Sequence, residues 1–372
     1  MNKSLYKPCG TIEHGIGRKQ FMGEFLTGMG AIAGTSLFSH PLGATEVAKH
    51  GKSVVVVYLN GGVSQFESWD PKIDLETGGP FKAIPTTVPG IHVSELIPYT
   101  AQQMHHMALI RSISTDLDDH GLANNLVRSG RMTRSATEYP ELGAVVAKGL
   151  ERPDFPLPGH ISTMAGGVGG RANNSAYLGP RYASVAVGAE KGGIVNTQLP
   201  DGMTLSVDSR RHDWRRFVNS RHRSRIQSAE MDAYTQCYEQ ALRLMEKREL
   251  FDISQESASV QEAYGKSEFG KQMLLARRLV EQEVPFIEIQ HGGWDFHHNN
   301  FEFHLHYVAD FDRPFAHFLT DLNQRGLLER TLVIVMTEFG RTPTINAGYG
   351  RDHYPRAWSI ALAGCGIQHG AI

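Results

Sequence analysis

The 372-residue sequence has little cysteine, almost no net charge and no long apolar run. Its three cysteines, Cys9, Cys237 and Cys365, are too few and too scattered for a disulfide framework or a thiolate zinc site. The 37 Lys and Arg residues nearly balance the 39 Asp and Glu residues, so the overall charge does not suggest a nucleic-acid partner. No stretch approaches the ~18 unbroken apolar residues of a membrane span. We therefore expect no nucleic-acid partner and no transmembrane segment.

Two familiar glycine-rich signatures are also absent from the sequence. Gly61-Gly62 follows an apolar run, but there is no Gly-x-Gly-x-x-Gly and no Walker lysine, so a nucleotide-cofactor site is not expected. There is no Gly-x-Ser-x-Gly elbow, which disfavours a serine esterase of the α/β-hydrolase type.

Short β-rich apolar runs alternate with helical patterns along most of the chain. The runs cover residues 53–59, 285–290, 331–336 and 358–363, with a shorter candidate at 107–111. Apolar residues recur at three- and four-residue steps over 228–247, 271–283 and 301–328. Strands that alternate with helices specify an α/β domain, and unbroken β-branched runs are typical of buried parallel strands. The sequence therefore predicts a mostly parallel central sheet flanked by helices.

The chain divides into an N-terminal segment, residues 1–50, and an α/β domain, residues 51–372. In the first, Arg18-Lys19-Gln20-Phe21 precedes a weakly apolar, Gly/Ala-rich stretch over 22–38, which resembles a degenerate twin-arginine export signal. The alternative is an amphipathic surface helix. Within the domain, residues 150–225 are rich in Gly, Pro and Arg and predict an irregular insertion. Because no helix pattern follows the last strand, the chain is expected to be truncated at its C-terminus.

The sequence is rich in histidine, with 18 in all, and several of them follow predicted strands. In parallel sheets, functional side chains gather at the carboxyl ends of the strands. The candidates there are Asp295, His297, Glu338 and His353. Carboxylates and imidazoles in neighbouring loops can share one cation, so we predict one divalent metal site, with zinc, calcium and manganese all open. The alternative is that these residues cap helices and bind loop backbone.

His120 lies beside Asp119, just before a helical pattern over 122–128. A helix N-terminus keeps an imidazole neutral, and a neutral imidazole can be a nucleophile, a general base or a metal ligand. Alternatively, Asp119 caps the helix and His120 is merely exposed. Arg341 and Arg351 are candidates for stabilising the charge of an anionic group. His304 and His306 are expected on the surface of a helix.

Five loop motifs occur in an order that resembles the bacterial domain-of-unknown-function family 1501 over residues 53–372. The motifs are Asn60-Gly-Gly-Val-Ser-Gln, Asp119-His-Gly, Gly292-Gly-Trp-Asp-Phe-His, Glu338-Phe-Gly-Arg-Thr-Pro and Gly350-Arg-Asp-His-Tyr-Pro. This family is similar to a distant branch of the alkaline phosphatase and sulfatase superfamily. The resemblance implies a fold of that type and, through the family's frequent twin-arginine signals, an exported protein in the periplasm or beyond.

The superfamily's metal-binding pattern is only partly kept in this sequence. Its retained positions match Asp295 with His297 (or, less directly, His298), the carboxylate of Glu338, and His353. Asn60 stands where the superfamily has a metal-binding Asp, and Phe339 stands where it has a His or Asn. In the register set by Ser129-Gly130-Arg131, His120 takes the place of the nucleophile. The resemblance therefore implies one metal rather than two.

The resemblance implies an exported, metal-dependent hydrolase or transferase of phosphate or sulfate esters. Its substrate would be an anionic small molecule or a glycan ester. The alternative is a catalytically degenerate member of the same fold that binds an anionic glycan or a protein partner, a role favoured by Asn60 and Phe339.

Overall fold

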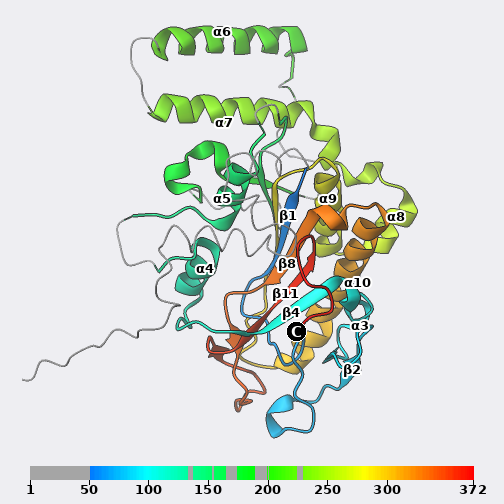
Figure 1. The fold of residues 1–372 in the computed structure, drawn as a ribbon. Coiled ribbons are helices and arrows are strands. Elements are labelled where there is room, and N and C mark those ends of the chain that lie inside the picture. Colours follow the sequence, from blue (N-terminus) through cyan, green and yellow to red (C-terminus); the bar gives the residue numbers. More distant parts are fainter. Residues whose placement is uncertain are drawn as a thin grey trace, which may run out of the picture.

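The computed structural model describes residues 51–132, 137–152, 155–164, 174–188, 199, 201–223 and 229–372. The expected export signal at residues 1–50 lies outside them. The described residues form a seven-stranded central sheet (Figure 1). Its strands, in spatial order, are β4 (Met107–Ile113), β11 (Trp358–Gly364), β8 (Thr331–Met336), β1 (Ser53–Leu59), β7 (Phe286–His291), β5 (His160–Met164) and β6 (Val185–Val187).

Five neighbouring strands of this sheet, from β8 to β6, run parallel to one another. β11 is antiparallel to both β8 and β4, so it alone among the described strands of the sheet runs the other way. As a result, the start of β11, near Trp358, lies at the edge where the parallel strands end, because Ala361 pairs with Val335. The expected mostly parallel α/β sheet is confirmed.

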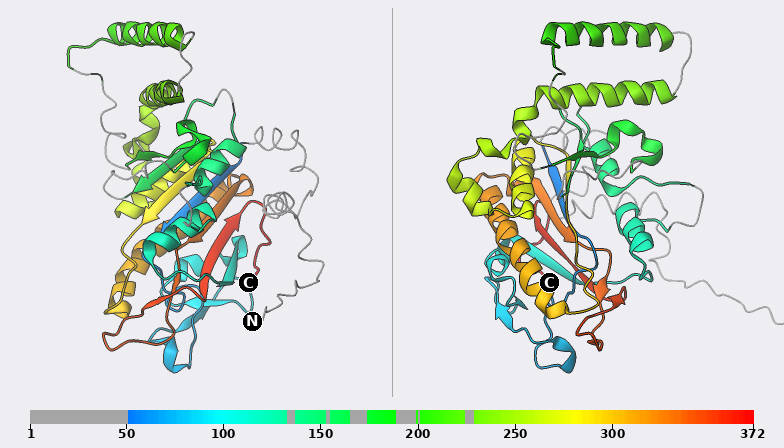
Figure 2. Two further views of the ribbon diagram at one scale, coloured as in Figure 1. Left: turned by 90° about the vertical axis from the view of Figure 1, so that its left-hand side faces the viewer. Right: turned by 180° about the vertical axis from the view of Figure 1, so that it is seen from behind.

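Helices cover both faces of the sheet, and β1 shows how its side chains divide between them. Val55, Val57 and Leu59 pack into the larger core with α9 (Glu268–Glu281) and α10 (Asn300–Gln324). The alternate residues of β1 belong to a smaller core, against which α4 (His120–Ser129) and α5 (Leu142–Gly149) pack with Val127 and Leu142. Because successive strand residues point to opposite faces, an all-buried strand needs cover on both sides. The two views of Figure 2 show the helical layers around the sheet.

Further helices and two small ribbons complete the described part of the chain. Helices α3 (Pro98–Ala101) and α8 (Ala258–Tyr264) pack against α10, and α6 (Leu205–Arg223) and α7 (Ala229–Glu246) form an outlying pair. Two small antiparallel ribbons are β2 (Ala83–Pro85) with β3 (His92–Ser94), and β9 (Gly340–Arg341) with β10 (His353–Tyr354). The 3-10 turns are Glu76–Gly78, Met104–His106, Ala176–Leu178, Pro180–Tyr182, Arg248–Phe251, Ile253–Gln255 and Leu328–Arg330.

The five strands expected from the sequence are all present, with ends shifted by no more than two residues. The segment 150–225, expected to be irregular, differs: its described residues include α6 and two strands of the central sheet, β5 and β6. β5 carries no continuous apolar run, because it includes the buried His160, Ser162 and Thr163, and β6 is only three residues long. Their short length and polar content hide them from a search for apolar periodicity.

Helix α4 is fixed at both ends, which sets the position of His120 at its first turn. The Asp119 carboxylate accepts a hydrogen bond from the Leu122 amide at 2.9 Å, so the expected N-cap is confirmed. Near the other end, Arg128 donates to both carboxylate oxygens of Glu288 on β7 at 2.6 Å, and its guanidinium lies 4.0 Å from the centre of the Tyr58 ring. This pair is buried and ties α4 to the sheet.

His304 is a correction to the sequence analysis, because it is fully buried rather than on the helix surface. The first turns of α10 pack against the loop after β7, where the His304 ring contacts Trp294 and Phe296. Its Nδ1 lies 2.7 Å from the Asn300 carbonyl oxygen. Burial lowers the pKa of this imidazole. His306, two residues on, is exposed as expected.

A search of the described helices finds none that is both long and apolar enough to span a membrane.

Replacing Arg128 by Met tests the tie between α4 and the sheet. The change leaves Glu288 as a buried, uncompensated carboxylate, so we expect a loss of about 3–5 kcal/mol in the free energy of unfolding, measured by urea denaturation. Adding Glu288→Gln should recover much of this loss because it removes the unpaired charge. The exposed Arg131 is the matched control, with an expected change for Arg131→Met within about 0.5 kcal/mol. A loss as small as the control's would contradict this account.

Candidate metal centre

Loops from four strands meet at the carboxyl edge of the sheet. Asp295 follows β7, Glu338 follows β8, and His120 begins the helix after β4. His353 precedes β11, and the reversed direction of that strand brings it to the same edge. The structure therefore gathers at one place residues that are up to 233 positions apart, as the separation of His120 and His353 shows.

The turn after β1 fits between these loops only because it is made of glycine. The Gly61 amide donates to Glu338 Oε1 at 2.8 Å, and a Cβ at Gly61 would lie 2.7 Å from the Asp295 amide nitrogen. Gly61 and Gly62 also have φ values of 122° and 79°, which side-chain-bearing residues rarely adopt. Gly61-Gly62 is thus a close-packing element of the site.

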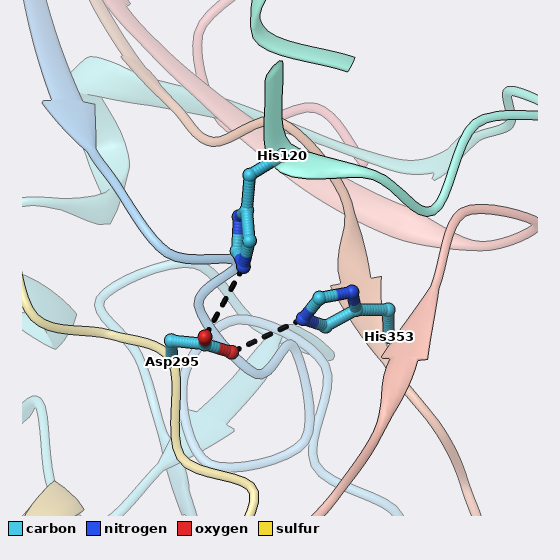
Figure 3. A group of neighbouring side chains, drawn as sticks. All are labelled: His120, Asp295 and His353. Atoms are coloured by element: carbon cyan, nitrogen blue, oxygen red, sulfur yellow. Dashed lines mark hydrogen bonds and ion pairs between the residues drawn. The ribbon is translucent and has the colours of Figure 1, made fainter. Parts of the chain in front are cut away.

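Asp295 is the centre of the cluster (Figure 3). Its Oδ1 lies 2.5 Å from Arg341 Nη2, 3.0 Å from His297 Nε2 and 3.1 Å from His353 Nε2, while its Oδ2 lies 3.2 Å from His120 Nε2. Burial alone would raise the pKa of Asp295, but the hydrogen bond and charge of Arg341, together with the contact of His353, outweigh it and hold the pKa well below its usual value. Asp295 is therefore ionised at neutral pH.

The three imidazoles around Asp295 share one arrangement, with Nδ1 held by an oxygen atom and Nε2 directed at the carboxylate. The Nδ1 partners are Glu338 Oε1 for His120 at 2.7 Å, the Asp118 carbonyl for His353 at 2.6 Å and Asp352 Oδ1 for His297 at 2.9 Å. Carbonyl and carboxylate oxygens only accept hydrogen bonds, so each Nδ1 carries a proton. In a neutral imidazole this leaves the Nε2 lone pair free, as in metal-binding histidines.

With Nδ1 protonated on each ring, the Nε2 lone pairs of the neutral imidazoles face one another and the Asp295 carboxylate. His297 Nε2 and His353 Nε2 lie 3.0 Å apart beside the Asp295 carboxylate, and His120 Nε2 is a buried atom without a hydrogen-bond donor. One ligand atom each of His120, Asp295 and His353 lies within 4.8 Å of the others. Protons or a metal ion would relieve this repulsion, and the donor set is one that divalent transition metals bind.

The cluster can be reached from solvent. The side chains of His120 and Asp295 are 34% and 43% exposed, whereas Glu338 behind them is completely buried. Asp295 is therefore the part of the cluster that solvent reaches, while His120 Nε2 is itself a buried atom.

Glu338, expected as a ligand, lies behind His120 rather than among the Nε2 atoms. Its carboxylate accepts hydrogen bonds from the Gly61 amide, from Thr337 Oγ1 at 3.1 Å and from His120 Nδ1. Burial, with the nearby Glu338 charge, raises the pKa of Tyr58 well above its usual value. The position of Glu338 is that of the carboxylate that orients a metal-binding histidine.

Arg341 and Arg351, expected near an anionic group, are both fully buried. Arg341 donates to Asp295 and to the carbonyl oxygens of Gly61, Gly62 and Arg351. Arg351 pairs with the buried Glu67 at 2.8 Å and donates to three further carbonyl oxygens. Both guanidinium groups therefore connect loops within the protein.

Sequence reasoning did not identify Glu67, and it did not assign the structural role of Phe339. Phe339 is buried, and its ring lies 4.9 Å from the ring of His120 and 4.3 Å from that of His353, centre to centre. Glu67 lies in the polar segment after β1, whose unusual composition is the one signal that could have drawn attention to it.

The model of one protein family, described as "Protein of unknown function (DUF1501)", matches residues 51–372. The chain therefore belongs to that family, and the resemblance noted in its loop motifs is confirmed. No curated protein matches the chain by sequence.

Several solved structures are similar to the chain at low sequence identity. The lipoteichoic acid synthase LtaP from Listeria monocytogenes is 8% identical, with a TM-score of 0.39 over 87% of this chain and 68% of the other. Alkaline phosphatase from the Antarctic bacterium TAB5 is 12% identical, with a TM-score of 0.37 over 84% of this chain and 92% of the other. At these TM-scores the likeness does not carry a reaction or a substrate over to this chain.

Gly350 is a test of how tightly the loops of the site pack. A Cβ at this position would lie 1.8 Å from the His297 carbonyl oxygen, so Gly350→Ala must push apart the loops that carry His297 and Asp352. We expect a loss of about 1–3 kcal/mol in the free energy of unfolding, measured by urea denaturation. Gly292 lies in the loop after β7 with open space around it, so Gly292→Ala should change stability by less than about 0.5 kcal/mol. Equal effects of the two changes would count against the close packing.

Proposed function

We propose that this member of the DUF1501 family is a metal-dependent enzyme that hydrolyses or transfers phosphate or sulfate esters. The observation that carries the proposal is the convergence of three Nδ1-anchored imidazoles on the ionised Asp295 carboxylate. Such an arrangement holds a cation, and it lies where loops meet at the carboxyl edge of an α/β sheet, which is the usual position of an active site.

His120, Asp295 and His353 would hold the metal, and His297 would be the fourth ligand or would stand beside it. Three nitrogen donors and one carboxylate favour zinc or a related transition metal, because calcium and magnesium prefer oxygen ligands. This narrows the choice that the sequence leaves open among zinc, calcium and manganese. Phe339 offers no donor atom next to His120 and His353, which supports one metal rather than two.

When bound, the metal would supply Lewis-acid polarisation of an ester oxygen. Around it, the chain's own residues have distinct roles. Glu338 fixes the ring of His120 through Nδ1, and Asp352 does the same for His297. Arg341 holds Asp295 in place and keeps it ionised, and we assign Arg351 to the support of the same loops.

We assign His120 to metal binding rather than to nucleophilic attack. Both of its ring nitrogens are committed, Nδ1 to Glu338 and Nε2 to the side facing Asp295. A nucleophilic imidazole needs one nitrogen free to meet phosphorus, and here that nitrogen lies in the ligand cluster.

The proposed substrate is an anionic small molecule or a glycan ester, and the proposed location is outside the cytoplasm. The argument for export rests on the Arg18-Lys19 pair and the weakly apolar segment that follows it. A non-catalytic member that binds an anionic glycan or a protein partner is the second candidate, favoured by the lack of a ligand side chain at Phe339 and of an acid at Asn60.

Metal content is the first test of this proposal. We expect the purified protein to hold about one zinc or similar ion per chain by plasma mass spectrometry. His353→Ala should lose most of it, and Glu338→Gln should weaken metal affinity about 10–100-fold because it alters the support of His120. His306→Ala, on the exposed side of α10, is the matched control and should bind metal normally. Metal-free protein that cannot be loaded by added ions would exclude the metal site.

Turnover is the second test, and it separates the two candidate functions. Aryl phosphates, phosphodiesters and aryl sulfates should be screened with several divalent ions, and we expect activity that a chelator removes and added metal restores. His120→Ala should abolish it, and rapid acid and neutral quenching should reveal no phosphohistidine. A trapped phosphohistidine would contradict the ligand role of His120. Stoichiometric metal without turnover on any ester would support the binding protein instead.

A further inference from the structure

Helix α6 is the outermost layer of the described molecule. It lies alongside α7, which separates it from the body of the protein, and both views of Figure 2 show the pair projecting beyond the sheet. Asn219 on α6 hydrogen-bonds Thr235 on α7 at 3.1 Å, and Arg216 pairs with Glu239 at 3.0 Å. The two helices are therefore joined by polar contacts.

The side of α6 that faces α7 is polar. The half-buried positions are Asp208, His212, Arg215 and Asn219, which recur at four- and three-residue steps and so share one helix face. Arg215 pairs with Glu239, and the ring of His212 lies 6.1 Å from that of Tyr238. A surface helix of a globular protein usually turns its apolar stripe inward, and α6 does the reverse.

The opposite side of α6 is apolar and exposed. Trp214, Phe217 and Val218 are 66%, 50% and 54% exposed. Val207, two helical turns before Trp214, lies on the same stripe. The Trp214 and Phe217 rings touch each other edge to face, 5.6 Å apart between centres. Large aromatic side chains grouped on one outward face mark an interaction surface.

The charge of α6 is strongly positive. The helix has six arginines and two aspartates, a difference of +4 with histidines neutral. Glu239 of α7 neutralises part of this charge at Arg215 and Arg216, and Asp208 and Asp213 of α6 pair with Arg211 and Arg216. Arg210 and Arg211 are exposed and border the apolar stripe, so the outward face combines aromatic rings with positive charge.

We propose that α6 docks this protein onto the surface of a bilayer that contains anionic phospholipids. Interfacial helices of this kind lie flat, place Trp, Phe and aliphatic side chains at the boundary of headgroups and acyl chains, and keep arginines among the anionic headgroups. The inverted polarity of α6 gives it that composition on its outward side. Because its polar side contacts α7, the helix can bind the bilayer without separating from the rest of the protein.

A second copy of the chain fits this surface less well. Pairing two α6 helices through their outward faces would bring identical arginines together, and four apolar side chains are few for the ~800 Å² per partner that a stable dimer buries. Docking through α6 also leaves the metal centre open, because the segment around β9 and β10 lies at the opposite end of the molecule (Figures 1 and 2). This inference does not depend on the proposed enzymatic function.

The full chain offers its own reporter for the test. Of its four tryptophans, Trp69, Trp294 and Trp358 are buried and Trp214 is exposed, so Trp214 alone should change its environment on binding. We expect a blue shift of emission with phosphatidylcholine vesicles that contain phosphatidylglycerol, and quenching of that emission by brominated acyl chains. Co-sedimentation should give a partition coefficient that falls as salt is added.

Two variants and a matched control separate the electrostatic from the hydrophobic contribution to vesicle binding. Arg210→Gln with Arg211→Gln should weaken partitioning about 30-fold, and Trp214→Ser with Phe217→Ser about 100-fold, while circular dichroism stays unchanged. Lys82→Gln with Lys266→Gln removes the same charge from exposed sites elsewhere and should have little effect. Equal partitioning of wild type and the arginine variant, no binding to anionic vesicles, or concentration-dependent dimers that Trp214→Ser dissolves would each overturn the proposal.

Discussion

The candidate metal centre depends on one buried cation, the guanidinium group of Arg341. Burial lowers its pKa, yet arginine remains protonated at neutral pH, and removing such a charge from water is costly unless its donors are used. Arg341 meets this need by donating to carbonyl oxygens at Gly61 and Gly62 and to the Asp295 carboxylate. It thereby joins the loops after β1, β7 and β8. Asp295 in turn draws the three imidazoles together, so the whole cluster follows from how this one charge is satisfied.

The sheet could be predicted from the sequence to a large extent, because its central strands are continuous β-branched runs, which are typical of buried parallel strands. The runs at 53–59 and 331–336 match β1 and β8. The placement of Asp295 and His353 at one edge also followed from the fold class. What the sequence could not show is that Glu338 lies behind His120, with its carboxylate on His120 Nδ1 rather than beside the Nε2 atoms. That arrangement depends on which loop lies deeper at the edge of the sheet, and no local sequence pattern records this.

The same limit explains the other differences. His304 lies on a helix whose apolar stripe could be identified, but the Trp294 and Phe296 rings that bury it come from a different loop. Arg341 and Arg351 were expected to bind an anionic group because they lie near the strand-end loops and a guanidinium can make two hydrogen bonds to such a group. Their burial depends on Glu67 and on carbonyl groups that no side-chain motif reveals. When the partners of a residue are distant in the sequence, its burial and its contacts cannot be predicted from the local pattern.

The reversed direction of β11 has a consequence for how this site can vary. The chain leaves β8 at Met336 and enters the neighbouring strand β11 at Trp358. The segment between them is therefore a loop with both ends anchored at the same edge of the sheet. Glu338 and His353 lie near the two ends of this loop, and residues 343–349 lie between them. Insertions in that middle stretch can lengthen the loop beside the candidate metal centre without changing the register of any strand. This segment can therefore change in length while the residues at its two ends keep their places at the edge of the sheet.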